Sequence, residues 1–117
     1  MLSKPHRLLS DKDFQKIWKR GRSFYTKILG FKILENSRAV SRFGIVVGTK
    51  VSKLATVRNR IKRQIREVIQ EKIIQIAPGY DLVISALPFA SGKKYEELKN
   101  DVISGLKHFG LINPTKK

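Results

Sequence analysis

Hydrophobic residues recur at steps of mostly three and four through one long stretch in the middle of the chain. This period is typical of an amphipathic helix whose apolar face packs on a core. The pattern predicts a helix over 56–76, which ends there because Pro78 excludes the residue before it from helical conformation. The apolar positions are Val57, Ile61, Ile65, Val68, Ile69, Ile73 and Ile76.

Other patterns predict the remaining elements. β-Branched and alternating apolar residues indicate strands, and capping and glycine signals indicate a helix near each end. In the first strand, Phe31 and Ile33 should point to one face and Lys32 to the other. The expected elements are a helix from Ser10 to about Arg20, strands over 23–35, 42–48 and 81–86, a closing helix over 93–109, and a frayed tail over 112–117.

The order of these elements indicates the fold class. Helices and strands that follow one another in this order predict an α+β protein with the helices packed on one face of a small mixed β-sheet. The chain shows no repeat and no linker, so residues 1–117 are expected to form a single domain. Strands 42–48 and 81–86 form a βαβ unit with the helix between them, for which general rules predict a right-handed crossover.

The basic residues concentrate in 50–66. This stretch carries no acidic residue, and its apolar stripe pushes the polar side chains together on the opposite side. Neighbouring like charges repel by about 0.2–0.5 kcal/mol per pair, and a helix start disfavours cations. A polyphosphate partner makes the arrangement favourable, because arginine binds phosphate in a bidentate manner and counterions are released. The basic residues are Lys50, Lys53, Arg58, Arg60, Lys62, Arg63 and Arg66.

The helical spacing also separates buried from exposed side chains. Ile61 and Ile65 should be buried against the sheet, and Lys62 and Arg66 should remain exposed.

The charge of the whole chain favours an anionic partner. Its 117 residues include 25 Lys and Arg against 9 Asp and Glu, which gives a net charge of +16. Nucleic acid is favoured over a membrane, because no apolar run approaches about 18 residues. No apolar signal segment follows the first residues, and the absence of cysteine excludes disulfides and thiolate chemistry, so a cytoplasmic location is expected.

The sequence shows no complete set of catalytic groups. A metal-dependent nuclease needs two or three converging carboxylates. Glu67 and Glu71 share a helix face, but basic neighbours favour surface ion pairs for both. His6 and His108 are expected to be solvated, and no phosphate-binding glycine loop is present. We therefore expect no metal and no small-molecule substrate on the protein itself.

Two aromatic residues on the first helix have two possible roles. Phe14 and Trp18 lie one turn apart among lysines. They can pack on the sheet as core residues, or they can stack unpaired bases, worth about 1–3 kcal/mol per base.

The run 55–67, with Arg58-Asn59-Arg60, resembles the signature helix of the protein subunit of bacterial ribonuclease P. The segment 43–47 leading to Lys50 is similar too, as is the opening with Arg7-Leu8 and 13–21. The resemblance covers nearly the whole chain in order and spacing. It implies a fold like the second domain of ribosomal protein S5, in which the crossover is left-handed.

The resemblance also implies a function and its residues. The protein would bind the catalytic RNA subunit and the 5′ leader of precursor tRNA, while the RNA hydrolyses the phosphodiester with magnesium at its own active site. The family's leader cleft uses aromatics at Phe14, Trp18 and one strand position, which aligns with Lys32 beside Phe31. The implied contacts to the catalytic RNA are Lys50, Lys53, Arg58, Asn59, Arg60, Lys62, Arg63 and Arg66.

Two other functions remain open at this point. The chain could be a small ribosomal or structural RNA-binding protein without an enzyme role, which would not alter the turnover of precursor tRNA. It could also be a stand-alone nuclease, which would cleave RNA without an RNA subunit.

Overall fold

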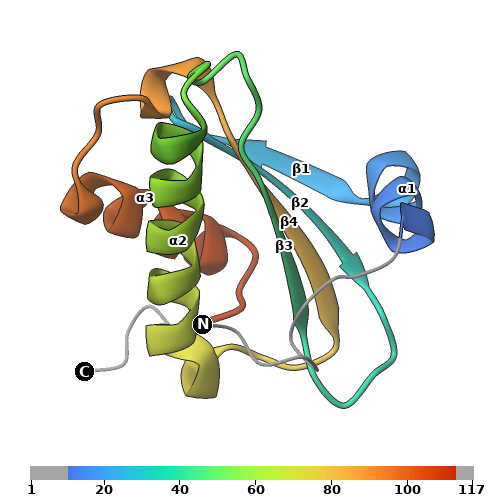
Figure 1. Cartoon of the computed structure of the whole chain (residues 1–117). Helices are drawn as coiled ribbons and strands as arrows, with labels where there is room; N and C mark the ends of the chain where they lie inside the picture. Colours follow the sequence, from blue (N-terminus) through green and yellow to red (C-terminus); the bar gives the residue numbers. More distant parts are fainter. Residues whose placement is uncertain (1–10, 113–117) are drawn as a thin grey trace.

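Four strands form one mixed sheet, with helices on both of its faces (Figure 1). The structure is a computed structural model and describes residues 11–112. Its elements are α1 (Asp11–Arg20), β1 (Arg22–Tyr25), β2 (Leu29–Glu35), β3 (Arg42–Val46), α2 (Ala55–Lys72), β4 (Tyr80–Ala86) and α3 (Tyr95–His108), with 3-10 turns η2 at Ile73–Gln75 and η3 at Pro88–Ala90.

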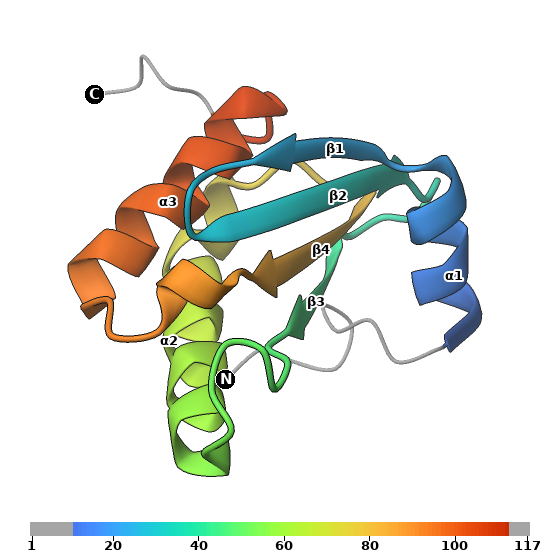
Figure 2. The ribbon, with the colours of Figure 1, turned by 90° about the horizontal axis from the view of Figure 1, so that it is seen from above.

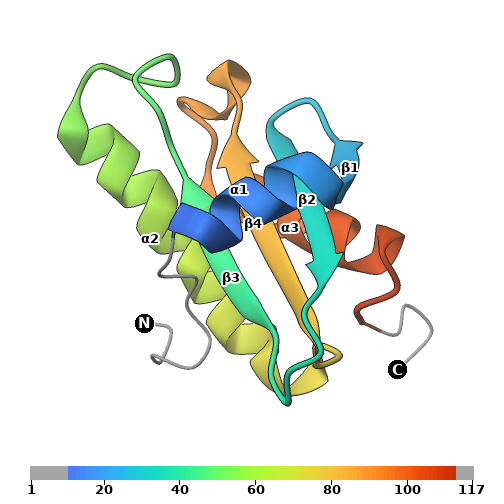
Figure 3. The same ribbon diagram turned by 90° about the vertical axis from the view of Figure 1, so that its right-hand side faces the viewer.

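The strands lie in the order β1-β2-β4-β3. Strand β2 pairs antiparallel with both β1 and β4, and β3 pairs parallel with β4. Figure 3 views the sheet from the side of α1, with β3 and β4 both running upward, β4 to the right of β3 and α2 behind them. The β3–α2–β4 crossover is therefore left-handed, as the family resemblance implied and against the general rule.

The segment 23–35, predicted as one strand, is a hairpin. Residues 26–28 turn the chain between β1 and β2, and Tyr25 pairs with Gly30. The Thr26 hydroxyl accepts from the main-chain N–H of Leu29 at 2.9 Å, and the Thr26 N–H donates to the Leu29 carbonyl at 2.8 Å. A threonine side chain thus makes the turn without the glycine, asparagine or proline that usually signals one.

The helices occupy both faces of the sheet (Figure 2). Helices α2 and α3 pack on the face that holds the main core, as predicted, but α1 lies on the opposite face, where Ile17 packs against Val83. Leu82, Val83 and Ile84 are all 0% exposed. Strand β4 is therefore apolar on both sides, and α1 covers the side that α2 and α3 leave open.

The buried face of α2 is the predicted one. Ile61 and Ile65 are fully buried in the main core. Lys62 and Arg66 are half-buried rather than exposed, because they flank the apolar stripe and their stems cover part of it. The α-helix ends at Lys72, earlier than predicted, and the turn η2 completes the segment.

The end of the described chain is packed rather than frayed. Leu111 and Ile112 are buried, and the Ala77 N–H donates to the Leu111 carbonyl at 2.8 Å. The predicted fraying is wrong for Ile112, whereas residues 113–117, like the helix-start residue Ser10, lie outside the described residues.

Helix α3 approaches the sheet closely at Gly105. A Cβ atom at this position would lie 2.4 Å from the ring of Phe31, which is 1% exposed. Glycine is normally unfavourable inside a helix, so its presence here follows from this contact.

We expect Gly105→Ala to lower the free energy of unfolding by about 1–3 kcal/mol, because the clash outweighs the better helix propensity of alanine. Urea denaturation measures the change. Gly48→Ala is the control, since a Cβ there meets nothing within 4 Å. Equal stability of the two variants would contradict the packing described.

Candidate nucleic-acid interfaces

The outer side of α2 carries adjacent polar and basic side chains. Asn59 and Arg63 are exposed, and Lys62 and Arg66 lie half-buried beside them. Positions three and four apart are neighbours on a helix surface, so these four side chains form one row. We call this set the α2 row.

The start of α2 adds positive charge next to the row. Its first turn has no acidic residue, and Leu54 at the N-cap makes no side-chain hydrogen bond. The amides of a first helical turn carry the positive end of the helix dipole. Arg58 donates from Nη1 to the Ser52 carbonyl at 3.0 Å, which ties the preceding segment, with the exposed Lys50 and Lys53, to the helix.

Arg60 lies apart from the α2 row. Positions 60, 64, 67 and 71 follow at steps of three and four, so Arg60 shares a flank with Glu71. Glu71 faces α3, where its carboxylate pairs with the Lys99 ammonium at 3.3 Å and raises the pKa of Lys99. The Nε and Nη2 atoms of Arg60 are buried with no hydrogen-bond partner among residues 11–112. Arg60, predicted to contact RNA with the other cations, therefore lies on a flank of the α2 row, the side of the helix that it shares with Glu71.

A hollow of about 200 Å³ lies on the other face of the sheet, beside α1. Two exposed aromatics line it, Trp18 at 45% and Tyr25 at 62% exposure. The Tyr25 ring lies over Gly30, where a Cβ would come within 2.9 Å of it. The Lys32 ammonium donates to the Trp18 carbonyl at 3.0 Å and lies 5.8 Å from the centre of its ring. The hollow is bordered by Trp18, Tyr25, Gly30, Phe31, Lys32 and Ser85.

Of the two strand candidates for the leader cleft, only Lys32 points into this hollow. The Phe31 side chain packs on the main core against Gly105, because successive strand residues point to opposite faces. Phe31 therefore borders the hollow without turning its ring into it, and its contact with the leader stays a prediction. Phe14 is half-buried and packs on Ile17, so it serves the small core under α1.

Tyr25 is the residue that sequence reasoning missed. A continuous strand over 23–35 offered no reason to place it beside Trp18, whereas the hairpin brings it opposite Gly30. The side-chain turn at Thr26 is the signal that could have found it.

The expectation that His108 is simply solvated is incomplete. Its ring is exposed, but it stacks on Phe24 with the ring centres 3.9 Å apart. The edge of Phe109 meets both rings, and Arg22 lies 5.5 Å from the Phe109 ring centre. This cluster joins β1 to the end of α3. His6 lies outside the described residues.

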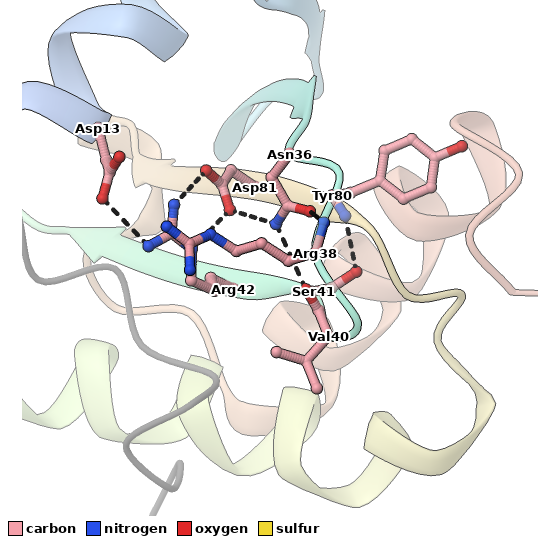
Figure 4. A network of polar contacts seen from close by, with 8 residues as sticks. All are labelled: Asp13, Asn36, Arg38, Val40, Ser41, Arg42, Tyr80 and Asp81. Atoms are coloured by element: carbon pink, nitrogen blue, oxygen red, sulfur yellow. Dashed lines mark hydrogen bonds and ion pairs between the residues drawn. The ribbon is translucent and has the colours of Figure 1, made fainter.

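A polar network connects α1 to the sheet (Figure 4). The Arg42 guanidinium donates to both Asp81 oxygens, at 2.9 and 2.7 Å, and its Nη1 lies 3.1 Å from the Asp13 carboxylate. The Asn36 amide donates to Asp81 at 2.7 Å. Hydrogen bonding and charge, chiefly from Asp81, raise the pKa of Arg42 further above its ordinary value, so it stays charged.

Among residues 11–112, no three histidine, aspartate or glutamate side chains gather where they could hold a metal ion. Glu71 makes a surface ion pair, as predicted, although its partner Lys99 comes from α3. No helix of this described part is long and apolar enough to cross a membrane.

The fold and these two surfaces define a class of protein. A small α+β domain with a cationic helix on one side of its sheet, and a lysine-lined aromatic hollow on the other, is typical of proteins that bind RNA.

Comparison with known proteins identifies the family. The ribonuclease P family model matches residues 2–110, and the chain belongs to this family. The ribonuclease P protein component of Synechocystis is 42% identical over 113 residues, covering 96% of this chain and 91% of that protein. The chain is therefore a subunit of the endoribonuclease ribonuclease P, and its partner is an RNA.

Solved structures agree with this assignment. A Staphylococcus aureus ribonuclease P protein, in a mutant form with defective mRNA degradation activity, superposes with a TM-score of 0.87 at 28% identity, covering 93% of this chain and 92% of that one. The Thermotoga maritima protein superposes with a TM-score of 0.80 at 29% identity, covering 87% and 96%. The mixed fold is thus the fold of ribonuclease P proteins.

Five cations of α2 predict a salt effect on RNA binding: Arg58, Arg60, Lys62, Arg63 and Arg66. If about five cations meet phosphates, log affinity for the RNA subunit should fall against log salt with a slope of order −4, and Arg63→Ala should flatten it by about one unit. Filter binding over a salt series measures the slope. Lys107→Ala, which removes an exposed charge on α3, is the control. An Arg63→Ala slope equal to that of the control would show that Arg63 is only solvated.

Proposed function

We propose that the protein binds the catalytic RNA through the α2 row and the 5′ leader of precursor tRNA through the α1 face, and so assists removal of the leader in the bacterial cytoplasm. The observation that carries this proposal is the separation of the two surfaces. Helix α2 and helix α1 lie on opposite faces of one sheet (Figure 2). A single chain can therefore contact two RNA segments at once.

The assignment of the α2 row to the catalytic RNA rests on charge and shape. A helix with adjacent cations and an uncapped, acid-free start suits folded RNA, which is recognised largely through its phosphates and shape. The contacts we propose are Lys50, Lys53, Arg58, Asn59, Lys62, Arg63 and Arg66, with Arg60 reaching RNA only from the flank next to α3.

The assignment of the hollow to the leader rests on its aromatic side chains. Single-stranded RNA is bound by stacking its bases on aromatic rings within a positively charged groove. Trp18 and Tyr25 offer two such rings, and Lys32 offers a cation 5.8 Å from the centre of the Trp18 ring. Phe14 supports the hollow from the core below α1.

Hydrolysis is assigned to the RNA subunit, with magnesium held at the RNA active site. The family resemblance suggests this division of work, and no carboxylate cluster among residues 11–112 offers an alternative site. The role of this chain is then to hold the two RNAs in position, which lowers the entropic cost of the reaction.

A reconstituted cleavage assay tests the proposal. The chain should alter turnover of precursor tRNA by a ribonuclease P RNA, whereas the chain without that RNA should not cleave. A structural RNA-binding protein would leave turnover unchanged, and a stand-alone nuclease would cleave alone.

In the assembled particle, Trp18→Leu should weaken precursor tRNA binding by about 1–3 kcal/mol, the value of one lost stack. Mature tRNA has no leader, so its affinity should not change. Folding should remain within about 1.5 kcal/mol of the parent, because leucine keeps much of the apolar volume. Phe89→Leu is the control, since Phe89 is also an exposed aromatic, at 69% exposure on η3, and is not among the residues that line the hollow. Equal losses for both tRNAs would contradict the leader assignment.

A further inference from the structure

Helix α1 has little apolar support of its own. Among its ten residues only Ile17 is fully buried, and it packs against Val83 with Phe14 and Leu34 beside it. Helices shorter than about 12 residues are marginal in water, so α1 depends on its contacts with the sheet. Its position over the sheet must therefore be fixed by further interactions.

An ion pair holds the first turn of α1. The Asp13 carboxylate lies 3.1 Å from Arg42 Nη1, and the two side chains are only 21% and 13% exposed. Arg42 itself is rigidly placed, because Asp81 binds it at two nitrogens and is only 7% exposed. Asn36 holds Asp81 in turn (Figure 4). The guanidinium is thus a fixed point on the sheet to which α1 is attached.

A second charged contact holds the last turn. The Lys32 ammonium donates to the main-chain carbonyl of Trp18 at 3.0 Å. Carbonyl groups of a last helical turn have no partner within the helix and attract cations. Helix α1 is therefore attached at both ends. Trp18, whose carbonyl makes the second contact, lines the hollow.

We propose that the Arg42–Asp13 ion pair is a positioning device for the leader: it fixes α1 over the sheet and so sets the separation of Trp18 from Tyr25. Neither Arg42 nor Asp13 touches the leader in this account. Both act through Trp18. The inference rests on the proposed function of the hollow, and it adds to the residues that line the hollow a pair that does not line it.

Asp13→Ala tests this without disturbing the sheet, because the Arg42–Asp81 contacts remain. Asp11→Ala is a matched control. Asp11 also lies in the first turn of α1, so its loss removes the same favourable charge near the helix start. Asp11 is exposed and has no ion pair with Arg42. The difference between the two variants isolates the ion pair.

The expected result has two parts. In the assembled particle, Asp13→Ala should weaken the affinity for precursor tRNA by up to about fivefold, the range for an ion pair of this kind. The affinity for mature tRNA should not change. In the RNA-free protein, fluorescence anisotropy should report a more mobile Trp18, the only tryptophan of the chain. Asp11→Ala should match the parent in both measurements.

Other outcomes overturn the inference. If Asp13→Ala and Asp11→Ala bind precursor tRNA equally well, the ion pair does not position α1 for the leader. If Asp13→Ala weakens the affinity for both tRNAs equally, the ion pair serves only the folding of the protein. A parent particle that binds precursor and mature tRNA alike would refute the leader assignment itself, before any variant is compared.

Discussion

Burial of one face of α2 is the constraint on which the rest of the structure depends. Ile61, Ile65, Val68 and Ile69 are all 0% exposed against the sheet. Each such side chain contributes about 1.5–3 kcal/mol, far more than the roughly 0.2–0.5 kcal/mol lost to each repulsive pair of cations. The core can therefore hold a row of cations in an arrangement that their mutual repulsion disfavours. Cations held close together in this way can bind a polyanion.

Strand β4 transmits this constraint to the opposite face. Leu82 and Ile84 belong to the core under α2 and α3, while Val83 packs with Ile17 of α1. A strand apolar on both sides needs cover on both sides, and α1 supplies the second cover. The result is a sheet with a cationic helix on one face and an aromatic hollow on the other, the arrangement on which the proposal of two RNA contacts rests.

The sequence predicted those features whose signal is local and periodic. The α2 stripe and its cations follow from spacing alone, and the left-handed crossover came only from the family resemblance. The hairpin was missed because Thr26 makes its turn with a hydroxyl. Tyr25 was therefore not predicted to line the hollow. The Asp13–Arg42–Asp81 network joins residues far apart in the chain, so no local pattern indicates it.

Site-directed cross-linking tests the central claim, that two RNAs meet opposite faces of one sheet, most directly. The chain has no cysteine, so a photoreactive group can be placed at a single introduced one. Asn59→Cys, in the α2 row, and Lys19→Cys, beside Trp18, are both exposed positions. In the particle with precursor tRNA, the first should cross-link to the catalytic RNA and the second to the 5′ leader. Cross-links from both positions to the same RNA segment would contradict the account.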